Sequence, residues 1–71
     1  MIRVAVYKID ELIGKVIYTD RGMRFEGGGE TFKTFIIELK KGDEYGSDRE
    51  FIRDLPERLR SYIHAHIEVD D

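Results

Sequence analysis

Two histidines and a glutamate near the end of the chain have side chains and spacing that could bind a metal ion. His64, His66 and Glu68 occupy alternate positions. In a strand all three lie on one face, with neighbouring members about 7 Å apart along the backbone. Two imidazoles and a carboxylate could supply three ligands to Zn²⁺ or Fe²⁺. The same row is typical of the solvated face of a strand, so the sequence predicts no tight metal site, and metal binding is an alternative function.

Four arginines lie close together in the sequence: Arg49, Arg53, Arg58 and Arg60. Arginine side chains commonly contact the phosphates of nucleic acids. Acidic residues at positions 48, 50, 54 and 57 are interleaved with them and cancel most of the positive field. Mixed signs on a helix usually indicate a solvated face. Nucleic-acid binding through these arginines is therefore a second alternative, which the sequence does not favour.

The glycine triplet Gly27–Gly29 stands ahead of a predicted helix, an order that also occurs in phosphate-binding loops. Glu30 places a carboxylate where the anion would bind, and no Lys-Ser or Lys-Thr pair follows in the spacing of a P-loop. The triplet therefore predicts a flexible connection between a hairpin and a helix.

The sequence offers no set of residues for nucleophilic hydrolysis. It contains no cysteine, and its only serines, Ser47 and Ser61, fall at a predicted helix cap and a predicted turn. A chain of 71 residues also has little room for the deep pocket that a substrate needs. We therefore expect a non-enzymatic protein with no catalytic residue and no cofactor.

The elements that position these residues begin with three strands. Residues 2–7 alternate between apolar and other side chains, as a half-buried strand does. Residues 13–19 are rich in β-branched and aromatic side chains, and 23–26 follow after a tight turn at Asp20-Arg21-Gly22. Gly22 can adopt the positive φ that a short hairpin requires. The first half of the chain therefore predicts a strand followed by a hairpin.

Residues 30–41 fit either a helix or a strand. Four apolar residues fall at helical spacing: Phe32, Phe35, Ile36 and Leu39. Glu30 in the first turn and Gly42 just past the end suit the helix dipole and cap, whereas the β-branched residues in between lower the helix propensity. We favour the helix.

A second helix begins at a capping box formed by Ser47 and Glu50. Pro56 lies inside the apolar pattern that follows, and it cannot donate a hydrogen bond to the carbonyl of Ile52. The helix is therefore expected to kink or restart there, and the cap-like residues 54–57 favour a restart.

The last segment, Tyr62–Val69, alternates without interruption and predicts a strand. Its buried face would carry Ile63, Ala65, Ile67 and Val69. The whole chain, residues 1–71, is then one small α+β domain with an antiparallel or mixed sheet of three to four strands and two helices, in the order β-β-β-α-α-β.

The pattern Phe-x-x-x-Leu-Pro-x-x-Leu-Arg extends from Phe51 to Arg60, and Gly-x-Val-x-Tyr occupies 14–18. Together they resemble the ending and the hairpin of small uncharacterised bacterial proteins. The resemblance covers about half of the chain and rests mostly on packing residues. It implies no activity, ligand or catalytic residue. The family pattern often has an extra Gly or Pro before the tyrosine, where this chain has only Ser61.

The composition limits the compartment and the class of partner. The net charge is −3, the chain contains no cysteine, and no apolar run approaches the length of a membrane span. A signal-peptide pattern is also missing at the start, so we expect a cytoplasmic protein that is not bound to a membrane. The absence of Asn and Gln hints at a thermophilic source.

The function predicted by elimination is a small protein-interaction or regulatory module. A domain of this size has a thin core and a small sheet in which many strands are edges, and sheet edges pair with other chains. Tyr7 and Tyr62, on the predicted first and last strands, are of a type enriched at interfaces. The predicted partner is another protein or a second copy in a two-fold homodimer. Edges protected by Lys8, Lys15 and the terminal aspartates would instead leave a monomer.

Overall fold

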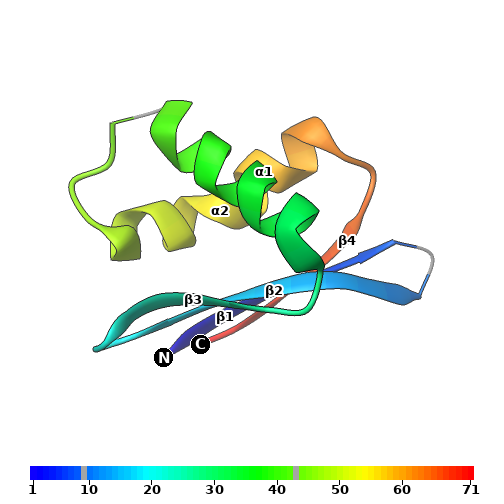
Figure 1. Cartoon of the computed structure of the whole chain (residues 1–71), viewed down its shortest axis with the longest axis horizontal. Coiled ribbons are helices and arrows are strands. Elements are labelled where there is room, and N and C mark those ends of the chain that lie inside the picture. The colour runs from blue at the N-terminus through cyan, green and yellow to red at the C-terminus, as the bar shows by residue number, and fades with distance from the viewer. Residues whose placement is uncertain (9, 43) are drawn as a thin grey trace.

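The computed structural model describes residues 1–8, 10–42 and 44–71 and confirms the α+β fold in the predicted order. The elements are β1 (Ile2–Lys8), β2 (Glu11–Thr19), β3 (Gly22–Glu26), α1 (Gly29–Gly42), α2 (Asp48–Tyr62) and β4 (His66–Asp70) (Figure 1). Within these residues, neither helix is long and apolar enough to cross a bilayer.

The four strands form one antiparallel sheet in the order β3-β2-β1-β4. The predicted hairpin joins β2 and β3, and Gly22 has a φ of 108° at its turn. β1 pairs with β2 on one side and β4 on the other, so the first strand is interior rather than an edge. The chain therefore begins and ends on neighbouring strands, with its two termini side by side (Figure 1).

Both helices lie on the same side of the sheet and leave its other side uncovered (Figure 1). The buried cluster between the layers draws on both helices and on every strand except β3. Its members are Ile2, Val4, Val6, Val16, Phe32, Ile36, Leu39, Phe51, Ile52, Leu55, Leu59 and Ile67. Since β1 contributes every second residue from Ile2 to Val6, the alternation seen in the sequence is the alternation between core and open face.

α1 confirms the helix favoured at residues 30–41, although β-branched residues lower its propensity. Its buried side chains are Phe32, Ile36 and Leu39, which lie on one side at helical spacing. Packing of this apolar side on the sheet outweighs the small loss from propensity, because burial of large side chains dominates helix stability in proteins.

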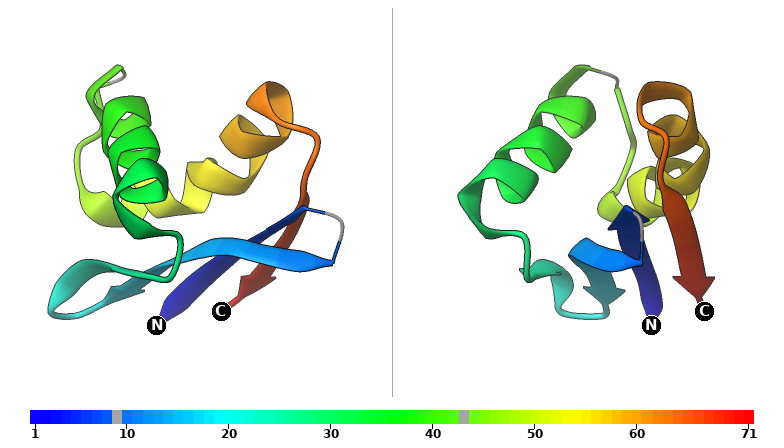
Figure 2. Two further views of the ribbon diagram at one scale, coloured as in Figure 1. Left: turned by 45° about the vertical axis from the view of Figure 1, so that its right-hand side comes forward. Right: turned by 90° about the vertical axis from the view of Figure 1, so that its right-hand side faces the viewer.

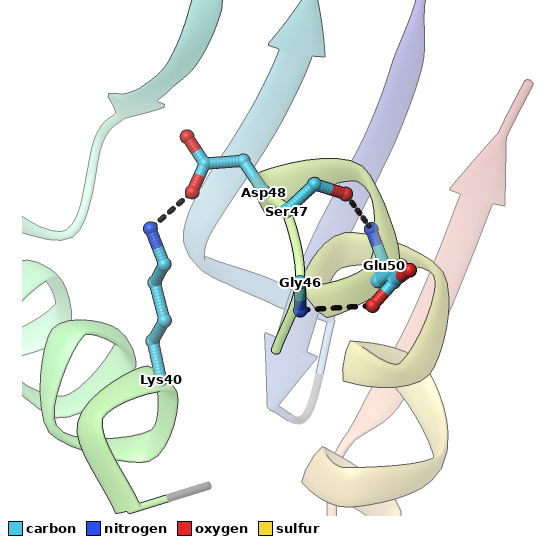
Figure 3. A network of polar contacts seen from close by, with 5 residues as sticks. All are labelled: Lys40, Gly46, Ser47, Asp48 and Glu50. Carbon is cyan, nitrogen blue, oxygen red and sulfur yellow. Dashed lines mark hydrogen bonds and ion pairs between the residues drawn. The ribbon is translucent and has the colours of Figure 1, made fainter. Parts of the chain in front are cut away.

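α2 begins where the capping box was predicted, with one change in its partners (Figure 3). The backbone N–H of Glu50 donates to Ser47 Oγ at 3.2 Å. The Glu50 carboxylate accepts from the backbone N–H of Gly46 at 2.9 Å, one residue before the cap. Lys40 of α1 forms an ion pair with Asp48, which ties the end of one helix to the start of the next.

The predicted restart at Pro56 is wrong, because α2 is a single helix from Asp48 to Tyr62. Pro56 is buried together with Leu55 and Leu59 on the side of α2 that faces the core. Burial of the proline ring compensates in part for the hydrogen bond that proline cannot donate.

The predicted boundaries of the last strand are also wrong. Tyr62 ends α2, residues 63–65 have no regular structure, and β4 begins at His66. Ile67 is buried as predicted, but Ile63 and Ala65 are half-buried and Val69 is 50% exposed. The last turn of the helix is held by the Ile63 N–H, which donates to the Leu59 carbonyl at 2.9 Å. The alternating residues 62–65 therefore form the end of α2 and the connection to β4, and they are not part of the sheet.

Candidate functional site

A cleft of about 540 Å³ lies between the N-terminal half of α1 and the C-terminal end of α2. Figure 2 shows these two segments standing apart over the end of the sheet. Its lining residues are Val6, Lys8, Ile13, Gly28, Thr31, Phe32, Phe35, Leu59, Ile63, His64 and Ala65. Most of these side chains are apolar, and the volume lies within the range of about 300–1,000 Å³ that is typical of small-molecule sites.

A bulge in the sheet and a close approach of α1 shape the floor of this cleft. Val6 pairs with Gly14, whereas Tyr7 pairs with Leu12, so Ile13 is an extra residue in β2. Ile13 packs against the core cluster at the base of the cleft. Gly28, with a φ of 76°, carries the chain into α1 so closely that an added Cβ would stand 2.5 Å from the carbonyl oxygen of Ile13. The glycine triplet thus provides close packing and a left-handed backbone.

Among the residues that the structure describes, the polar side chains that line the cleft are Lys8, Thr31 and His64. They come from the end of β1, the first turn of α1 and the segment after α2. All three are exposed. Among the described residues that line the cleft there is no aspartate or glutamate, so its charged groups are basic.

The structure brings together two of the three predicted metal ligands. His66 Nε2 and Glu68 Oε2 lie 3.1 Å apart on β4. Both residues pair with β1 positions on the open face of the sheet, and the His66 ring lies 6.1 Å from that of Tyr7. His64 precedes the strand and lines the cleft. Within the described chain no group of three His, Asp or Glu residues is placed to hold a metal, and the metal site stays a prediction.

The four arginines of α2 do not form one basic surface. Arg49, Arg53 and Arg60 follow one another at spacings of four and seven residues, which puts them on one side, and Arg58 lies about half a turn away. Their partners are spread likewise. Arg53 lies 3.9 Å from Asp71, Arg60 lies 2.7 Å from Glu57, and Arg58 donates to the Tyr45 hydroxyl at 3.1 Å. Nucleic-acid binding through these residues stays a prediction.

Tyr45 is the centre of a polar network against α2. Its hydroxyl donates to Asp54 Oδ2 at 2.8 Å, and its ring packs edge-on against Phe51 at 5.2 Å. Burial raises the pKa of the Tyr45 phenol, and the hydrogen bond to the Asp54 carboxylate raises it further. The arrangement anchors the loop between the helices to the body of α2.

The outer side of β4 is the second candidate surface, because β4 is an edge of the sheet (Figure 2). Val69 lies opposite Val4, on the core side, yet stays 50% exposed at this edge. The acidic residues at the end of the chain already have partners, Arg3 with Asp70 at 3.7 Å and Arg53 with Asp71 at 3.9 Å. Among the described residues, the edge therefore offers the outer backbone of β4, which no strand pairs, and one apolar side chain.

Sequence reasoning missed the cleft and with it the roles of Lys8, Thr31 and the half-buried Phe35. We expected little room for a deep pocket, and the helices leave an open-sided cleft of about 540 Å³. The glycines at 14 and 28 were the available signal, because both mark places where α1 approaches β2 closely. Comparison with known proteins gives no match to a family model, to a curated protein or to a solved structure.

Proposed function

We propose that this chain is a small non-enzymatic protein-interaction module whose first partner is a second copy of itself, joined through the β4 edges. The observation that carries the proposal is the order of side chains around Ile67, which is complementary to itself in an antiparallel pairing. We expect the module to act in the cytoplasm.

A two-fold axis through Ile67 places each residue on one side of Ile67 opposite a residue of complementary charge or polarity in the partner subunit. His66 then stands opposite Glu68 of the partner subunit, so an imidazole N–H faces a carboxylate twice across the axis. Because His66 and Glu68 already lie 3.1 Å apart within one chain, the pairing would make one cluster of four groups. Directly opposite residues in antiparallel strands have Cβ atoms about 4.5–5.5 Å apart, within reach of such contacts.

The core side of the same pairing is apolar. Ile67 faces its own copy, and Ala65 faces Val69 of the partner subunit. The exposed half of Val69 would leave water, which favours association in proportion to the apolar area removed. With the axis at Ile67, only His66, Ile67 and Glu68 of β4 lie opposite β4 of the partner subunit. We therefore expect a weak dimer that forms by a closed two-fold rather than a fibre.

Sedimentation equilibrium over a range of concentrations tests this proposal. We expect the mass to rise above 8.4 kDa as the concentration approaches about 1 mM, where an association energy of about −4 kcal/mol becomes measurable. A mass that stays at 8.4 kDa throughout would rule out the homodimer and leave a different protein as the partner.

Charge exchange tests the register. The exposed side chains of His66 and Glu68 can be replaced without touching the core. Glu68→Lys should weaken association, because a lysine then faces His66 of the partner subunit. The double variant His66→Glu with Glu68→Lys should restore it, because opposite charges face each other again. Glu26→Lys makes the same charge change on β3, at the other edge of the sheet, and should leave association unchanged. Equal weakening by Glu26→Lys would contradict the proposal.

A further inference from the structure

The cleft between α1 and the end of α2 is apolar over most of its wall and basic at its charged positions. Phe32, Phe35 and Leu59 line it from the helices, Ile63 lines it from just after α2, and Val6 and Ile13 line it from the sheet. A ligand that fills such a wall must itself be apolar over most of its length, because a buried polar group without a partner is unfavourable.

The two basic residues of the cleft have no ion-pair partner among the described residues. Lys8 lies opposite Glu11 in the register of β1 and β2, yet the two side chains do not come within ion-pair distance. His64 lies between α2 and β4 and shares the same cleft. The ammonium group has three donors and an imidazole ring has at least one, so both can donate to an anion.

We infer that this cleft binds a small carboxylic acid with an unbranched apolar tail. The tail lies along Phe35, Ile13 and Ile63, and the carboxylate accepts hydrogen bonds from Lys8 and His64. Hydrogen bonds from a cationic donor to a carboxylate are shorter and stronger than neutral ones, so they fix which end of the ligand faces water. A cationic head of the same length would meet the like charge of Lys8. This site adjoins the β4 edge and shares Ala65 with the proposed dimer contact, but ligand binding does not require self-association.

Titration of the full-length protein with octanoate, octan-1-ol and octylammonium tests the inference, with the backbone amide signals followed by NMR. We expect octanoate to shift the amides of residues 28–35 and 63–65 and to reach saturation. Octanol should bind at least about tenfold more weakly, and octylammonium more weakly still. Equal affinity for the three probes, or shifts confined to the open face of the sheet, would overturn the inference.

Two kinds of variant test separately how the cleft binds the apolar tail of the ligand and how it binds the carboxylate. Thr31→Trp places a large ring in the cleft and should abolish octanoate binding. Thr34→Trp makes the same change at an exposed threonine one turn along α1, which does not line the cleft, and should bind octanoate as the wild type does. Ala65→Leu narrows the cleft from the opposite wall and gives a second measurement if Thr31→Trp perturbs the fold.

Lys8→Gln and His64→Gln test whether these two side chains bind the carboxylate of the ligand. Both side chains are exposed, so neither change disturbs the core. We expect each variant to reduce the preference for octanoate over octanol while leaving the affinity for octanol unchanged. A preference for octanoate that survives both substitutions together would show that these residues do not bind the carboxylate, and would overturn the assignment.

Discussion

Gly14 of β2 lies so close to the ring of Phe32 in α1 that an added Cβ would stand 2.5 Å from ring atom Cδ2. This contact lies where the first turn of α1 meets β2, beside the cleft that Phe32 lines. We expect Gly14→Ala to lower the free energy of unfolding by about 1–3 kcal/mol, since the overlap forces the helix or the ring to move. Urea denaturation of both proteins measures the difference.

Gly42→Ala is the matched control, because an added Cβ at Gly42 meets nothing within 4 Å. It should be neutral or slightly stabilising, as alanine has the higher helix propensity. The double variant Gly14→Ala with Phe32→Leu should be less destabilised than the sum of the single changes, because the smaller side chain removes the overlap. Simple additivity would contradict a direct contact as the cause.

Ser47→Ala should destabilise the protein by about 1 kcal/mol, because it removes the acceptor for the backbone N–H of Glu50 at the start of α2. Thermal unfolding followed by circular dichroism would show a lower Tm. Ser61→Ala is the comparison, since Ser61 is exposed and donates only to a carbonyl of its own helix, that of Glu57. If the two alanine variants had the same Tm, Ser47 would have no special role as a cap.

The Tyr45 phenol should make stability depend on pH in the alkaline range. Its folded-state pKa is raised above the ordinary value of 10.0, so the folded protein holds this proton more tightly than the unfolded chain. The resulting stability is fully present below pH 10 and is lost as the pH rises through the higher folded-state pKa. The difference in unfolding free energy between the wild type and Tyr45→Phe should therefore be constant from neutral pH to about pH 9 and shrink above pH 10. If the difference in unfolding free energy did not change with pH, burial and the hydrogen bond to Asp54 would not be raising the pKa of Tyr45.

We expect no stoichiometric binding of Zn²⁺ at micromolar concentration. His66 and Glu68 come together, but His64 lies outside the strand, and within the described residues no third His, Asp or Glu joins them. Titration with Zn²⁺ while the imidazole signals are followed by NMR checks this. Tight binding that is lost in His64→Ala would establish the metal site and place it ahead of self-association as the function.

Local patterns in the sequence were sufficient for the class and order of the elements. The alternation of residues 2–7, the turn at Gly22 and the capping residues around Ser47 all act through neighbours a few positions apart. The helical spacing of Phe32, Ile36 and Leu39 predicted α1 against its own propensity, because the period of buried side chains carries more weight than single-residue preferences.

Tertiary structure alone decided where β1 lies in the sheet, where α2 gives way to β4, and that a cleft exists. Alternation in residues 62–65 fits a strand as well as it fits the exit from a helix. In the structure the N–H of Ile63 donates to the carbonyl of Leu59, so the chain is still helical at Tyr62. The place of Ile13 at the base of the cleft depends on a one-residue shift between β1 and β2, of which Gly14 was the single local sign. Each of these features arises from contacts between residues distant in sequence, whose energies depend on packing between strands and helices rather than on the order of neighbouring residues.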